Sequence, residues 1–185
     1  MATTKIQAAP QTAKRSFSAG SVISAIGRWI VRNRIYLIAF AIPAVLTYLA
    51  YALFGLYPFG EESVLCLDLN GQYVYYFEAL RDAFWGDGSI FYNWSRNLSG
   101  EFMGIIGYYL ASPFTLIVML LPEKFMLSSL LIMQLCKLGA AGATFNYFLQ
   151  KRRGVQPYPS LLFSTMYAMM AYGVIQLIDP MWLDG

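Results

Sequence analysis

Charged residues divide sharply between the two sides of the long apolar runs of this chain, and this division constrains the fold most. Nine of the thirteen Lys and Arg residues lie in two groups free of acids, Lys5, Lys14, Arg15, Arg28, Arg32, Arg34 and Lys151, Arg152, Arg153. All ten Asp and Glu residues lie in other segments. Because Lys and Arg are retained on the cytoplasmic side of a membrane, the pattern predicts a membrane protein with a cytoplasmic N-terminus.

The composition supports this interpretation. Hydrophobic residues make up 58% of the chain and charged residues 12%, with a mean hydropathy of +0.50, which is far more apolar than a soluble domain. The net charge of +3 is concentrated on the expected inner face, where anionic lipid accounts for it, so membrane lipid is an expected partner and nucleic acid is not. The absence of His removes His-based catalysis and most zinc sites from this stretch.

The apolar runs predict an all-α, multi-spanning protein with three crossings, since about 20 apolar residues span a bilayer. Residues 1–35 are expected to form a basic cytoplasmic tail with an interfacial helix, and 36–57 the first transmembrane helix. Residues 58–124 form a large outer loop with helices along the membrane surface. Residues 125–149 cross inward, 150–158 form a cytoplasmic loop, 159–178 cross outward, and 179–185 return to the outer face.

The apolar segment 104–121 is an alternative crossing. A crossing there would place Lys151, Arg152 and Arg153 outside, against the charge rule, so we expect it to pack near the outer surface with an interruption at Pro113. Because three crossings are too few to enclose a large intramembrane site, we expect the chain to be the N-terminal portion of something longer, inactive by itself.

Asp68 is the first candidate for chemistry. It follows an apolar stretch and precedes a predicted helix whose apolar face repeats at Tyr73, Phe77, Leu80 and Phe84. Its carboxylate would be held near the outer surface, as a general base or as a ligand of a divalent cation. The structural alternative is that Asp68 caps the helix, because Asp is a favoured N-cap residue.

Five other residues are candidates at the same face or within a span. Asp184, with Asp179, reaches the outer face from a distant part of the sequence, where two carboxylates would share a metal or divide acid and base roles. Lys137 lies inside a span, which indicates either a polar interhelical contact or a contact with a lipid phosphate. Arg81 and Arg96 are outer-loop cations suited to phosphate, although a solvated helix face also explains Arg81.

A set of short motifs in a fixed order resembles the bacterial YfhO membrane-protein family. The motifs are Tyr57-Pro58-Phe59-Gly60, Asp68-Leu69-Asn70 with Gln72-Tyr73, Gly86-Asp87-Gly88-Ser89, Tyr108-Tyr109-Leu110-Ala111-Ser112-Pro113 and Met181-Trp182-Leu183-Asp184. That family is similar to GT-C glycosyltransferases, which take a sugar from a polyprenyl-phosphate carrier at the outer face of the membrane.

The resemblance implies a GT-C-like fold and a glycosyltransferase that moves a sugar from a polyprenyl-phosphate-linked donor to a cell-envelope polymer such as teichoic acid. In such enzymes an acidic residue of the first outer loop serves catalysis or metal binding, and Asp68 is the matching position here. A divalent metal is therefore a possible cofactor, with Asp68 as its candidate ligand. The resemblance also implies a bacterial cell-membrane location and surface helices between the first two crossings.

Two functions of other classes remain open from the residues alone. Lys137 within a span is compatible with a transporter or a lipid-carrier flippase. The aromatic outer loop is compatible with a non-catalytic scaffold that docks other envelope enzymes.

Overall fold

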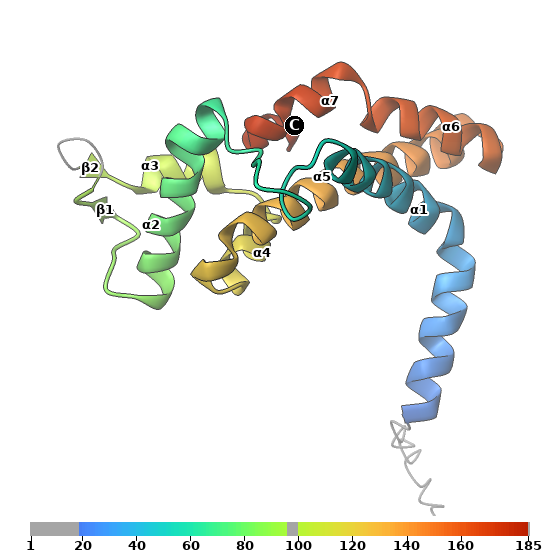
Figure 1. The fold of residues 1–185 in the computed structure, drawn as a ribbon. Coiled ribbons are helices and arrows are strands. Elements are labelled where there is room, and N and C mark those ends of the chain that lie inside the picture. Colours follow the sequence, from blue (N-terminus) through green and yellow to red (C-terminus); the bar gives the residue numbers. More distant parts are fainter. Residues whose placement is uncertain (1–18, 96–99, 185) are drawn as a thin grey trace, which may run out of the picture. The chain divides into compact units, whose positions relative to one another are not determined.

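The computed structural model describes residues 19–95 and 100–184, and most of them are helical (Figure 1). The two short strands β1 (Tyr92–Asn93) and β2 (Gly100–Glu101) pair antiparallel and form the only sheet in the described part of the chain. The predicted helical fold class is thus confirmed.

The first helix, α1, runs without a break from Ala19 to Leu53. The sequence predicts a surface helix and a separate first crossing here, whereas the structure has one continuous helix that ends before residue 57. The chain nevertheless divides into two compact units, Met1–Arg34 and Ile35–Gly185, close to the predicted boundary at residue 35. The candidate site belongs wholly to the second unit.

The main core lies between residues 58–124 and the helix α5 (Met126–Arg153). A π-helical turn, η1 (Leu69–Tyr73), continues into α2 (Val74–Trp85), and Tyr73, Phe77 and Leu80 are buried along one face. These side chains pack in one cluster with Leu130 of α5. The predicted apolar face is therefore a packing face, except at Phe84, which is 62% exposed.

Residues 103–125 form short pieces instead of one long helix. They are α3 (Met103–Ile105), the π-helical turn η2 (Ile106–Leu110), α4 (Thr115–Leu120) and the 3₁₀ turn η3 (Glu123–Phe125). The chain breaks around Pro113, where a helix would lose a backbone N–H donor. No piece is long enough to be a candidate membrane span; the side of the membrane on which they lie stays a prediction.

The last third of the chain is a helical hairpin followed by short turns. α5 (Met126–Arg153) ends on its three basic residues and on Gly154, which has a left-handed φ of +64°, the usual geometry of a helix C-terminus. α6 (Pro157–Ala168) lies alongside α5 (Figure 1). α7 (Ala171–Ile175) and the 3₁₀ turns η4 (Gln176–Ile178) and η5 (Pro180–Leu183) follow.

In the described part of the chain, two helices are long and apolar enough to cross a membrane, within Gly20–Leu53 and Glu123–Arg153. A third crossing is formed if the bent pair Pro157–Ala168 and Ala171–Ile178, which meet at 47°, acts as one span. These segments overlap the three predicted runs.

Candidate functional site

Asp68 lies at the start of η1, immediately after a residue with an unusual backbone. Leu67 has a φ of +48° and a side chain that is 75% exposed. This left-handed backbone conformation is unfavourable in free energy for any residue that has a Cβ atom. Such strain is concentrated at functional sites. Asp68 is therefore preceded by a strained backbone that the start of a helix does not require.

The carboxylate of Asp68 does not cap its helix. Asp68 occupies the N-cap position, but its side chain makes no capping hydrogen bond. Instead, Gln72 Nε2, one turn later, donates to Asp68 Oδ1 at 3.2 Å. The capping hydrogen bond considered from the sequence is thus not formed.

Asp179, at the junction of η4 and η5, lies within hydrogen-bonding reach of Asp68. Burial raises the pKa of Asp179, and the charge of Asp68 and a hydrogen bond to it raise that pKa further. The negative charge of Asp68 disfavours ionisation of the neighbouring Asp179. The structure therefore brings together a carboxylate pair from distant parts of the sequence.

Two tyrosines adjoin this pair. Tyr73 and Tyr109 pack edge to face with ring centroids 5.6 Å apart, and the charges of Asp68 and Asp179 contribute to the raised pKa of each phenol after burial. The Tyr73 hydroxyl is buried beside the Met181 backbone without a hydrogen bond of good geometry. Both phenols thus stay protonated and are able to donate hydrogen bonds to an oxygen at the site.

Lys137 and Asp184 form an ion pair. Lys137 Nζ lies 2.7 Å from Asp184 Oδ2 and donates to the Pro180 carbonyl at the same distance, while Ser112 Oγ donates to Asp184 Oδ1 at 2.9 Å. Lys137 thereby ties α5 to η5, directly beside Asp179. This is the polar interhelical contact considered from the sequence, with a partner that spacing did not indicate.

Gln134, one turn before Lys137, extends this polar layer. Its Oε1 accepts from the Tyr51 hydroxyl of α1 at 2.9 Å, and its Nε2 donates to the Leu177 carbonyl at 2.8 Å. Buried polar groups are stable inside a protein when they are paired in this way. The layer fixes the segment that carries Asp179.

Arg81 has a structural contact that the sequence did not suggest. Its Nη1 donates to the carbonyls of Val118, at 2.7 Å, and of Leu121, at the C-terminus of α4, where a cation complements the helix dipole. Its role as a phosphate ligand stays a prediction. Arg96, the other predicted phosphate ligand, lies outside the described residues.

A divalent metal would find two carboxylates at Asp68 and Asp179. No group of three or more His, Cys, Asp or Glu side chains with metal-binding geometry occurs among the described residues. Further oxygen ligands for a metal at this pair would have to come from elsewhere. The role of Asp68 as a metal ligand therefore stays a prediction.

Sequence reasoning missed three residues of the site. The sequence places Ser112, Gln72 and Tyr109 inside the ordered motifs but indicates no role for their side chains. Their membership of those motifs was the available signal, since a polar or aromatic residue inside an ordered motif is a candidate for the site. The motif residues Asp68, Tyr109, Ser112 and Asp184, scattered along the chain, gather in one region of the second unit.

The long apolar helices and the polar layer inside them define a helical membrane protein. The family model for the bacterial membrane protein YfhO matches residues 39–185. The chain belongs to the YfhO family, as the motifs indicated. No significant match was found among curated proteins or among solved structures.

Proposed function

We propose that the chain is part of a bacterial membrane glycosyltransferase that moves a sugar from a polyprenyl-phosphate carrier to a cell-envelope polymer such as teichoic acid. The observation that carries the proposal is the Asp68–Asp179 carboxylate pair, which lies outside the candidate membrane spans. By the positive-inside rule, the N-terminus of the chain would be cytoplasmic and the Asp68–Asp179 pair would face the outer side of the membrane.

In the proposed reaction, Asp68 acts as the general base. Its carboxylate accepts the proton of an acceptor hydroxyl as that oxygen forms a bond to the anomeric carbon of the sugar. The bond between that carbon and the carrier phosphate breaks, and the phosphate leaves with the electron pair. Asp179 and Gln72 hold the Asp68 carboxylate in position, and the Tyr109 hydroxyl is available to donate to the reacting oxygens.

The ion pair of Lys137 bears on the alternative of a lipid-carrier flippase. A lysine that binds a phosphate inside a membrane needs an ammonium group free to meet it, whereas Lys137 Nζ is engaged by Asp184 and Pro180. The observation supports a structural role for Lys137 and for Asp184, and the transferase is the better supported proposal.

The test is Asp68→Asn in the intact protein in its native membrane. We expect the sugar content of the envelope polymer, measured by mass spectrometry, to fall by roughly 10²-fold or more, the usual contribution of a general base. Glu61→Gln is the matched control, because Glu61 is an exposed acid of the same segment and lies outside the ordered motifs. Unchanged sugar in Asp68→Asn, at membrane levels equal to wild type, would show the proposal to be wrong.

A further inference from the structure

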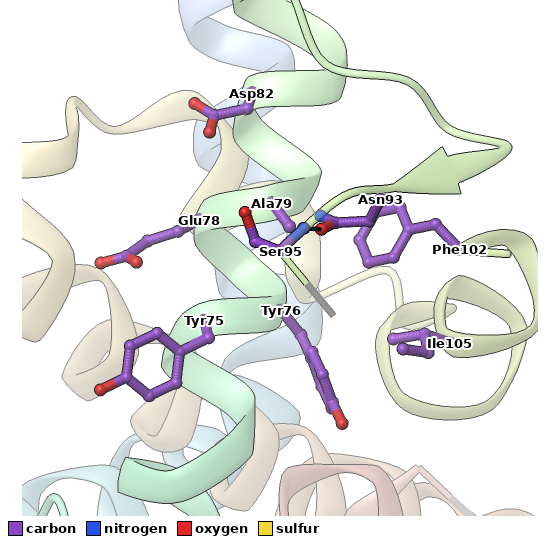
Figure 2. Close-up of a pocket in the computed structure, with 9 residues that line it drawn as sticks. All are labelled: Tyr75, Tyr76, Glu78, Ala79, Asp82, Asn93, Ser95, Phe102 and Ile105. Carbon is purple, nitrogen blue, oxygen red and sulfur yellow. Dashed lines mark hydrogen bonds between the residues drawn. The ribbon is translucent and has the colours of Figure 1, made fainter. Parts of the chain in front are cut away.

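An open groove of about 330 Å³ lies beside α2, on the side of the β1–β2 hairpin (Figure 2). This volume falls at the lower end of the range of about 300–1,000 Å³ for small-molecule sites. The buried side chains of Phe102 and Ile105 contribute an apolar wall. The groove is large enough for one sugar-sized ligand.

The exposed aromatic and polar side chains of the groove match the two faces of a polyhydroxylated ligand. Tyr75 is one of the residues that line the groove and is 61% exposed, and a tyrosine ring packs well against the C–H face of a sugar at little cost in conformational entropy. Asn93 and Ser95 line the groove from the hairpin. Asn93 Oδ1 accepts from Ser95 N at 2.7 Å, which orients the carboxamide so that its Nδ2 group is a placed donor.

The charged residues that line the groove, within the described part of the chain, are acidic. They are Glu78 and Asp82. Burial raises the pKa of Glu78, and the neighbouring Glu123 and Asp82 raise it further. A phosphate would be repelled here, whereas the hydroxyl groups of a neutral sugar or polyol would donate hydrogen bonds to these carboxylates.

The groove leads to the carboxylate pair through two tyrosines. Tyr76 lines the groove and contacts Tyr109, with ring centroids 5.1 Å apart. Tyr109 in turn lies close enough to Asp68 and Asp179 for their charges to raise its pKa. A ligand in the groove would contact Tyr76, whose partner Tyr109 is the tyrosine near the proposed base.

We infer that this groove binds a neutral polyhydroxylated unit, the sugar or polyol part of the acceptor polymer, with Tyr75 as the stacking platform and Asn93 as a hydrogen-bond donor. The assignment to the acceptor rests on the proposed function, because it is the acceptor hydroxyl that must reach Asp68. Binding itself does not depend on that function.

The test measures binding of methyl glucoside and of ribitol to the intact, detergent-solubilised protein by saturation-transfer NMR. We expect both probes to give a signal that Tyr75→Ala and Asn93→Ala abolish and that Tyr75→Phe retains, because the ring is preserved. Tyr158→Ala is the matched control, since Tyr158 is an exposed tyrosine of α6 outside the groove. Inorganic phosphate, followed by its ³¹P signal, should not bind at the groove.

Equal probe signals in wild type, Tyr75→Ala and Asn93→Ala would overturn the inference, as would binding of phosphate that depends on these residues. The outcomes are separable from the proposed function. If Asp68→Asn abolishes sugar transfer but the probes show no Tyr75-dependent binding, the groove is not a sugar site and the transferase proposal still holds. If the probes bind in a Tyr75-dependent way but Asp68→Asn retains full sugar transfer, the groove is a sugar site and Asp68 is not the general base.

Discussion

Lys137 and Asp184 form an asymmetric ion pair: the lysine side chain is 1% exposed and the aspartate side chain is 27% exposed, although their charged atoms are only 2.7 Å apart. The cost of losing one partner depends on how well solvent can replace it. Asp184 reaches solvent and Lys137 does not. Lys137 therefore depends more on Asp184 for stabilisation of its charge than Asp184 depends on Lys137.

This asymmetry predicts unequal effects of the two single substitutions. Asp184→Ala leaves a buried ammonium group without its counterion and should lower the free energy of unfolding by about 3 kcal/mol. Lys137→Met leaves a partly solvated carboxylate and should cost about 1 kcal/mol. Denaturant unfolding in detergent measures both, and the double variant should recover much of the Asp184→Ala loss. A larger cost for Lys137→Met would contradict this account of the pair.

The Asp68–Asp179 pair predicts how stability depends on pH. A carboxyl group whose pKa is raised on folding favours the folded state when protonated, so this contribution is lost as pH rises from the ordinary value of 3.8 through the raised pKa of Asp179. Asp68→Asn removes the charge next to Asp179 but leaves Asp179 buried. The pH-dependent loss of folding free energy should therefore be smaller in this variant than in wild type. Unfolding of wild type and variant across pH 4–7 measures the difference, and identical pH profiles would contradict the pairing.

The backbone of Leu67 predicts a separation of stability from activity. Leu67→Gly removes the Cβ that makes a φ of +48° costly and should raise the free energy of unfolding by about 1 kcal/mol. If the strained turn positions Asp68, sugar transfer should fall in the same variant. Leu67→Ala is the control, since it keeps the Cβ and should change neither quantity; a stability gain there would show that backbone strain is not the cause.

Close contact between α1 and α5 predicts a strict requirement for a small residue at Gly142. A Cβ at this position would lie 2.4 Å from the Ala39 carbonyl oxygen and 3.0 Å from Pro43 Cγ, and a backbone oxygen cannot easily move away. Gly142→Ala should therefore destabilise the protein by about 2 kcal/mol. Gly107→Ala is the matched control, because a Cβ at Gly107 meets nothing within 4 Å. Thermal unfolding measures both.

Arg81 offers a test between a structural role and a phosphate-binding role. Because its guanidinium donates to carbonyls at the end of α4, Arg81→Gln should lower the free energy of unfolding by about 2 kcal/mol. With a purely structural role, the KM for the polyprenyl-phosphate donor stays unchanged in the folded fraction. A rise in that KM without any loss of stability would favour the phosphate-binding role.

The helices and the buried face of α2 could be predicted because they depend on local patterns. Tyr73, Phe77 and Leu80 repeat at spacings that place them on one side of a helix, and the structure buries all three. Phe84 follows the same spacing but is 62% exposed. Periodicity indicates a face, whereas the extent of its cover depends on the tertiary fold.

The candidate site could be predicted only residue by residue. Asp68, Asp184 and Lys137 were all identified as unusual, but their pairing was not, because spacing along the sequence does not indicate which distant segments meet. Asp68 meets Asp179, while Asp184 meets Lys137. The left-handed backbone at Leu67 was also unpredictable, since a leucine gives no local signal for a positive φ.

The origin of the carboxylate pair has a consequence for the biosynthesis of the protein. Asp68 leaves the ribosome well before Asp179, and its partner becomes available only after α5, α6 and α7 have been made and inserted. Until then, Asp68 has neither its neighbouring carboxylate nor the adjoining turn that Lys137 anchors. A nascent chain would therefore hold a half-assembled site until this point, and the site would be completed only when η4 and η5 dock against the segment that carries Asp68.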